Sequence, residues 1–222
     1  MSAAEHGRQM SRIRVKICGV TTIDDVHAAA DAGADAIGLN FHAPSPRFVD
    51  PHAAGPLIRA LPPFLSPVGV FVEQPVPQMC ALAYQLGLQS VQWVGREPPQ
   101  EDTYPFGLIA AFRVQQAADL DVIRAYVDRM RSLARAPAAI LIDAHVPGQF
   151  GGTGQTAPWK LLDGFDPGVP LILAGGLTPE NVAEAIRTVR PYGVDVASGV
   201  ESSPRRKDPK KVLHFVEAVR GA

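Results

Sequence analysis

Short apolar runs, rich in β-branched residues, recur along the chain and contain few polar positions. The eight runs are Ile13–Cys18, Ala36–Phe41, Val68–Val72, Ser90–Val94, Gly107–Phe112, Ala139–Asp143, Pro170–Ala174 and Val194–Ala197. Their apolar positions are nearly continuous rather than alternating with polar ones. Each run therefore predicts a strand that is buried on both faces.

Segments with apolar residues three and four positions apart separate these runs and predict helices. They are Asp24–Ala32, Val76–Leu86, Asp119–Ala134, Pro179–Val189 and Pro209–Val219, with a weaker pattern at Pro56–Leu61. Gly33 is the expected C-terminal cap of the first helix, and Thr178 and Pro179 are the expected N-cap and first residue of another. Residues 95–104 are rich in proline, so the helix after the fourth strand is expected to be short or missing.

Strands that alternate with helices pair in parallel and are joined by right-handed crossovers. Such a chain folds either as an open doubly wound sheet or as a closed (β/α)8 barrel. Eight units in 222 residues fit the barrel, and no Gly-x-Gly-x-x-Gly motif follows the first strand. We therefore predict the α/β class, with a single (β/α)8 TIM barrel over residues 13–222 and a polar tail over residues 1–12.

Composition narrows the class of protein without indicating a reaction. Hydrophobic residues make up 46% of the chain and charged residues 19%, which argues against disorder. The net charge of −1 argues against a nucleic-acid partner, and no apolar run is long enough for a membrane span. The start of the chain lacks the apolar run of a secretory signal, and Cys18 and Cys80 do not make a disulfide framework. We expect a cytoplasmic protein, either a monomer or a homodimer.

Three polar residues lie at the carboxyl ends of predicted strands or in the loops that follow them, which is where barrel enzymes place their catalytic residues. Cys18 ends the first strand; it is either a small buried hydrophobe or a thiolate, with a pKa lowered by nearby cations, that acts as a base or nucleophile. Asp143 ends the sixth strand, where it either caps a turn or serves as a general acid or base. Arg47 lies in a loop stiffened by Pro44 and Pro46 and is a candidate carboxylate-binding residue.

Glycine-rich loops follow the last three strands. Gly154 closes one of them, Gly175 and Gly176 follow the seventh strand, and Ser198 and Gly199 follow the eighth. Exposed backbone N–H groups bind phosphate, and the last two loops are where barrels commonly bind it. The six histidines show no ligand spacing, so we expect no metal site. These residues predict an enzyme that acts on a small phosphorylated molecule.

Six motifs follow one another along the chain. They are VKICGVT at 15–21, SPR at 45–47, GVFV at 69–72, GGTG at 151–154, LAGGL at 173–177 and VASGVE at 196–201. Together they resemble the phosphoribosylanthranilate isomerase family, and the match extends from about Arg14 to the C-terminus.

The resemblance implies a step of L-tryptophan biosynthesis that needs no cofactor. In it, N-(5-phosphoribosyl)anthranilate becomes 1-(2-carboxyphenylamino)-1-deoxyribulose 5-phosphate by an Amadori rearrangement. By analogy with the family, Asp143 is the general acid that protonates the ribose ring oxygen and Cys18 the general base that removes the C2 proton. Arg47 then holds the anthranilate carboxylate, and the two final loops hold the phosphate.

Two departures from the family pattern keep other functions open. Val94 stands where the family usually has histidine, and Glu73 where it tends to have asparagine. These departures leave open a catalytically impaired barrel that binds phosphorylated ligands or a partner protein. Another ribose-phosphate barrel enzyme is a further alternative, although an epimerase is expected to carry a metal site. An indole-glycerol-phosphate synthase is expected to carry inner-strand lysines, for which Lys16 is the one candidate.

Overall fold

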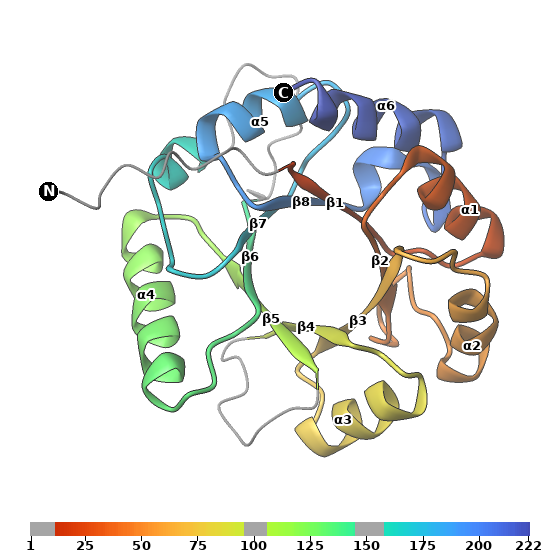
Figure 1. Ribbon diagram of the computed structural model, residues 1–222, viewed down its shortest axis with the longest axis horizontal. Helices are drawn as coiled ribbons and strands as arrows, with labels where there is room; N and C mark the ends of the chain where they lie inside the picture. Colours follow the sequence, from red (N-terminus) through yellow and green to blue (C-terminus); the bar gives the residue numbers. More distant parts are fainter. Residues whose placement is uncertain (1–11, 96–105, 145–157) are drawn as a thin grey trace, which may run out of the picture.

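The computed structural model describes residues 12–95, 106–144 and 158–222, which form a closed barrel of eight parallel strands (Figure 1). The barrel strands are β1 (Arg14–Cys18), β2 (Ala36–Asn40), β3 (Ser66–Val72), β4 (Ser90–Val94), β5 (Gly107–Arg113), β6 (Ala139–Asp143), β7 (Leu171–Ala174) and β8 (Gly193–Val196). Each strand pairs with its neighbours in sequence, and β1 pairs with β8 to close the ring. The predicted fold class is confirmed.

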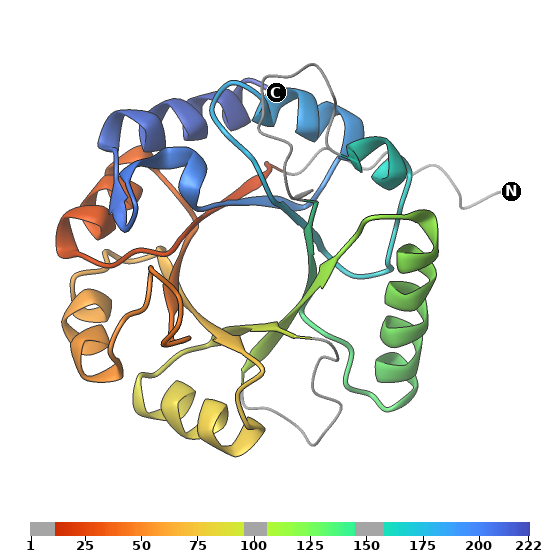
Figure 2. The ribbon, with the colours of Figure 1, turned by 180° about the vertical axis from the view of Figure 1, so that it is seen from behind.

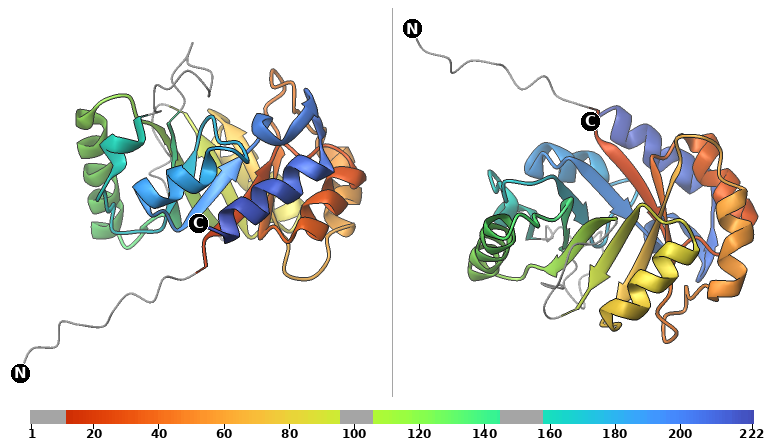
Figure 3. Two further views of the ribbon diagram at one scale, coloured as in Figure 1. Left: turned by 90° about the horizontal axis from the view of Figure 1, so that it is seen from above. Right: turned by 60° about the horizontal axis from the view of Figure 1, so that its bottom comes forward.

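Helices surround the barrel on its outer side, as the views from either end and from the side show (Figures 1, 2 and 3). The α-helices are α1 (Ile23–Ala32), α2 (Pro51–Arg59), α3 (Val76–Gln85), α4 (Ala117–Ser132), α5 (Val182–Val189) and α6 (Pro209–Arg220). Two 3₁₀ helices, η1 (Pro158–Leu162) and η2 (Ser198–Val200), and a hairpin of β9 (Glu201–Ser203) and β10 (Arg206–Lys207) complete the described chain. No helix of the described residues is long and apolar enough to cross a membrane.

Side chains alternate between two buried regions along each strand. The larger region lies between the strands and the helices, and the smaller one fills the barrel interior. The interior cluster consists of Val68, Ile109, Ala111, Ala139, Leu141 and Ala174. Because most of these side chains are small or β-branched, the interior has room for polar residues from β1, β4 and β8, which are described below.

All eight strands and four of the six helices lie within two residues of their predicted ends. The predicted C-cap Gly33 is confirmed, since it has a left-handed φ of 80° and donates its N–H to the end of α1. The expectation of a short or missing helix between β4 and β5 falls on residues 96–105, which lie outside the described residues, so it stays a prediction.

Two helix starts were predicted wrongly. Helix α2 begins at Pro51 rather than Pro56, because Asp50 accepts a hydrogen bond from the N–H of His52 and caps the helix at 2.8 Å. Helix α5 begins at Val182 rather than Pro179, so Thr178 is not its N-cap.

Of the predicted polar tail over residues 1–12, the structure describes only the last residue. Residues 1–11 lie outside the described residues, and the side chain of Arg12 forms an ion pair of 2.8 Å with Asp35. The division between tail and barrel therefore stays a prediction.

Candidate active site

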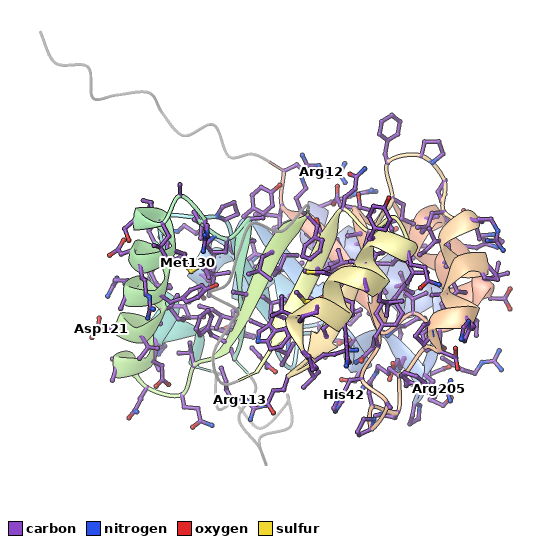
Figure 4. All side chains as sticks on the ribbon, turned by 90° about the horizontal axis from the view of Figure 1, so that it is seen from below. Arg12, His42, Arg113, Asp121, Met130 and Arg205 are labelled. Atoms are coloured by element: carbon purple, nitrogen blue, oxygen red, sulfur yellow. The ribbon has the colours of Figure 1, made fainter. Side chains whose placement is uncertain are left out.

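The carboxyl ends of the barrel strands face one end of the barrel, which we call the mouth. Figure 4 shows His42, Arg113 and Arg205 at this end, whereas Arg12 lies at the opposite end. Cys18 and Asp143 are the last residues of β1 and β6 and so also lie at the mouth. Both residues are partly exposed, although the thiol of Cys18 is itself largely surrounded by protein.

A buried lysine lies beside Cys18. Lys16 is 5% exposed, and its Nζ donates to Asp195 Oδ1 of β8 at 2.8 Å and to Gln92 Oε1 of β4 at 3.0 Å. Gly38 of β2 leaves room for this group: a Cβ at Gly38 would lie 2.8 Å from Cys18 Sγ and 3.0 Å from Lys16 Nζ. The thiol and the ammonium therefore occupy the same small space, which the missing side chain provides.

The predicted lowering of the Cys18 pKa is wrong for the protein without a ligand. Burial raises the pKa of this thiol, because desolvation disfavours the thiolate, and the carboxylate of Asp195 acts in the same direction. The ammonium groups of Lys16 and Lys207 oppose that change without cancelling it. Sequence reasoning anticipated the cations but not the extent of burial.

Arg47 lies over the backbone of Gly19, the residue after Cys18, and is held there by an acid. Its Nε and Nη2 donate to the two carboxylate oxygens of Glu201, each at 2.7 Å. A second cation, Lys207, donates from Nζ to Glu201 Oε1 at 3.1 Å. The predicted carboxylate-binding arginine thus already binds one carboxylate of its own chain, with a two-pronged geometry that fixes its orientation.

Glu201 is held as a carboxylate in this cluster. Although burial alone would raise its pKa, the hydrogen bonds from Arg47 and Lys207 lower the pKa below the usual range. Burial lowers the pKa of Lys207, and its carboxylate partner only partly offsets that change. The hydrogen bond to Glu201 raises the pKa of Arg47, which stays charged.

The glycines after β7 and β8 have the conformations that the loops require. Gly175 and Gly176 have left-handed φ values of 91° and 66°, which favour glycine. Their N–H groups donate to no group in the described part of the chain and so remain available. Gly199 packs so closely on the backbone of Leu177 that a Cβ at this position would meet its carbonyl oxygen.

The side chain of Asn181 fixes the loop after β7. Its Oδ1 accepts from the N–H of Thr178 at 2.8 Å, and its Nδ2 donates to the carbonyl of Gly176 at 2.9 Å. These two bonds keep the chain in a turn up to Val182, which explains the late start of α5. Gly154, the remaining predicted phosphate-binding residue, lies outside the described residues.

A family model described as N-(5'phosphoribosyl)anthranilate (PRA) isomerase matches residues 15–218. The N-(5'-phosphoribosyl)anthranilate isomerase of Geobacter sulfurreducens is 46% identical over 210 residues, which make up 94% of this chain and 99% of that protein. The chain belongs to this isomerase family. It is a phosphoribosylanthranilate isomerase of tryptophan biosynthesis.

Solved structures of phosphoribosylanthranilate isomerases agree with the barrel described above. The Thermotoga maritima isomerase is 36% identical, with a TM-score of 0.83, and the match covers 95% of this chain and 100% of that one. An isomerase in complex with reduced 1-(o-carboxyphenylamino)-1-deoxyribulose 5-phosphate is 34% identical, with a TM-score of 0.80 and the same coverage. A further structure contains monomers generated from the dimeric Thermotoga enzyme; it is 32% identical, with a TM-score of 0.79 and the same coverage.

The two departures from the family pattern lie next to each other. Val94 packs against the interior cluster at the mouth end of β4, and the N–H of Glu73 donates to its carbonyl at 3.0 Å. The neighbouring Trp93 packs in the outer region between strands and helices. Its ring therefore does not replace the missing imidazole as a surface facing the mouth.

Sequence reasoning gave no role in the isomerase to four charged residues that lie near the candidate site. They are Lys16, Arg113, Glu201 and Lys207. The available signals were a lysine two residues before Cys18 and a glutamate at the end of the VASGVE motif. Arg113 is paired in register with Asp143, so two neighbouring strands place a cation and an acid at the mouth. The described residues contain no cluster of His, Cys, Asp or Glu suited to a metal ion.

Proposed function

We propose that Cys18 and Asp143 carry out the isomerisation as general base and general acid. The observation that supports these roles is their position: β1 and β6 lie on either side of β7 and β8, and the N–H groups of Gly175 and Gly176 after β7 donate to no group among the described residues. A phosphate at those loops places the ribose between the thiol and the carboxyl group. Each proton transfer by a well-placed group contributes about 10²- to 10⁴-fold in rate.

The proposed reaction has two proton transfers. Asp143 donates a proton to the ribose ring oxygen, the bond from C1 to that oxygen breaks, and the anthranilate nitrogen supplies electrons to form a Schiff base. The Cys18 thiolate then removes the proton from C2. The C2–H electrons form a C1–C2 double bond, the nitrogen regains its electron pair, and the resulting enol tautomerises to the ketone.

The substrate's two anionic ends bind on different sides of the mouth in this proposal. The phosphate accepts from the backbone of Gly175 and Gly176, with Ser198 and Gly199 beside it, because the packing of Gly199 on Leu177 joins the two loops. The carboxylate accepts from Arg47, and Gly154 completes the ligand contacts. Val94 adds an apolar wall near the aromatic ring.

Rescue of a tryptophan-auxotrophic strain that lacks its phosphoribosylanthranilate isomerase tests the activity in a cell. We expect the wild-type chain to restore growth without tryptophan and Cys18→Ala to fail at equal protein level. Growth must also fail when the strain lacks the preceding enzyme, which shows that rescue depends on the ribotide. A soluble, folded chain that does not rescue growth would instead support the catalytically impaired barrel.

We also propose that the chain forms a homodimer through the end of the barrel opposite the mouth. Phe64, between α2 and β3, is 99% exposed. The same end carries a recess of about 360 Å³ lined by the first residues of several strands and by Tyr192 and Phe64. A protruding aromatic side chain and a recess on one face suit a two-fold contact, and the Thermotoga enzyme is described as dimeric.

Phe64→Asp is expected to convert this dimer to a monomer, because a carboxylate would be desolvated at the contact. Light scattering after size-exclusion chromatography measures the mass of each variant. Val122→Asp on α4 is the control, since Val122 is also an exposed apolar residue and is expected to leave the mass unchanged. A monomeric wild-type chain would contradict the proposal.

We also propose that the protein is cytoplasmic. Cys18 and Cys80 are both free thiols, which suits a reducing compartment. Fractionation of cells that express the chain tests it, and recovery with membranes or secreted protein would contradict it.

A further inference from the structure

Glu201 closes the VASGVE motif, and the proposed chemistry gives it no task. Its side chain is buried, and both carboxylate oxygens are used: Oε1 accepts from Arg47 Nε at 2.7 Å and Lys207 Nζ at 3.1 Å, and Oε2 accepts from Arg47 Nη2 at 2.7 Å. A guanidinium has further donors on its other edge, here Nη1 and the second hydrogen of Nη2. Glu201 therefore occupies one edge of the Arg47 guanidinium and leaves the donors on the other edge for a ligand.

The charges of the cluster allow Arg47 to bind a second carboxylate. Lys207 supplies a positive charge next to Glu201, so Arg47, Glu201 and Lys207 together keep a net positive charge. Asp25 lies nearby, but its carboxylate accepts from the backbone N–H groups of Lys207, Thr21 and Thr22. These backbone donors stabilise the Asp25 carboxylate, so it does not draw a hydrogen bond from Arg47.

Glu201 is itself fixed by contacts that do not involve Arg47. Lys207 Nζ also donates to the carbonyl of Ala197 at 3.0 Å, and Lys211 Nζ of α6 donates to the carbonyl of Glu201 at 2.9 Å. Helix α6 also packs against α1, so the outer helices hold Lys211, and through it the backbone of Glu201, in place. A fixed acid can hold a long, flexible side chain in one orientation before the substrate arrives.

We propose that Glu201 is a positioning residue that orients Arg47 for the substrate carboxylate. An arginine loses much rotamer freedom when it binds, and affinity improves when that freedom is lost beforehand. The aliphatic part of the Arg47 side chain lies across Gly19, where any side chain on residue 19 would collide with it. This contact also restricts the conformation of Arg47. The inference rests on the proposed function of Arg47 in holding anthranilate.

Glu201→Gln tests this inference, because glutamine keeps the size but loses the charge and one of the two acceptors. We expect KM for N-(5-phosphoribosyl)anthranilate to rise about tenfold, which corresponds to about 1.4 kcal/mol, while kcat changes by less than about twofold. The expected KM effect is absent with N-(5-phosphoribosyl)aniline, which lacks the carboxylate. Glu217→Gln, an exposed glutamate on α6, is the matched control and is expected to match the wild type with both substrates.

The same measurement in an Arg47→Ala background separates positioning from general stabilisation. If Glu201 acts through Arg47, Glu201→Gln has no further effect on KM there. An undiminished penalty in that background, or an equal penalty with the aniline substrate, would overturn the inference. If Arg47→Ala itself leaves KM unchanged, the proposed function of Arg47 fails, and the inference fails with it.

Glu201→Asp keeps the test decisive if Glu201→Gln does not fold. The shorter side chain retains the charge near Lys207 but does not reach both Arg47 nitrogens in the observed arrangement. We expect a folded protein with raised KM and nearly unchanged kcat. A wild-type KM in this variant would contradict positioning by the two-pronged contact.

Discussion

Cys18→Ala is expected to lower kcat for the ribotide isomerisation by about 10³-fold, because no other group replaces the base that removes the C2 proton. Absorbance or fluorescence of the anthranilate group measures turnover. Cys80→Ala is the matched control: Cys80 is also a free thiol, but it lies on α3 away from the mouth, and its loss is expected to leave kcat unchanged. Wild-type turnover in Cys18→Ala would show that another group is the base.

The pH dependence of kcat/KM checks the same assignment. Only the thiolate can accept the proton, and burial holds the pKa of Cys18 above the ordinary value of a thiol. The reactive fraction therefore increases as the pH rises towards that pKa and levels off above it. We expect this rising limb in the wild type and its loss in Cys18→Ser, whose hydroxyl does not titrate in the accessible range. A flat profile in the wild type would contradict a thiol base.

Asp143→Asn is expected to lower kcat by about 10²- to 10⁴-fold, since an amide keeps the shape of the side chain but supplies no carboxyl proton to the ring oxygen. KM is expected to change little, because the phosphate loops and Arg47 remain. Asp121→Asn, an exposed aspartate on α4, is the control and is expected to behave as the wild type. Steady-state kinetics measure both parameters.

Binding of a product analogue separates loss of chemistry from loss of the site. Asp143→Asn and Cys18→Ala should both bind reduced 1-(o-carboxyphenylamino)-1-deoxyribulose 5-phosphate within a few-fold of the wild type in calorimetry. A variant that is folded but does not bind the analogue would show that its residue binds the ligand rather than transferring a proton.

The local pattern of the sequence predicted the strands well because a strand buried on both faces must be apolar throughout. It placed Cys18 and Asp143 at one end of the barrel, since parallel strands of a barrel all end on the same side. Helix starts were less predictable. At Thr178 and Pro179 the cap pattern was present, but the side chain of Asn181 bonded to the preceding loop and moved the start of α5.

Contacts between residues far apart in sequence account for the remaining part of the site. Lys16 meets Asp195 and Arg47 meets Glu201 only because the barrel closes between β8 and β1. No local spacing encodes such pairs. The sign of the Cys18 pKa change was missed for the same reason, because burial depends on every neighbouring strand, whereas cations can be counted in the sequence.

Gly38 has a consequence for engineering this protein. Glycine in a strand is a common choice for replacement by alanine, because the change reduces the entropy of the unfolded chain. At this position the added methyl group would occupy the space of the Cys18 sulfur and the Lys16 ammonium. Gly38→Ala would therefore displace the thiol and the buried ion pair of Lys16 with Asp195, so a stabilised variant of this enzyme should keep glycine at this position.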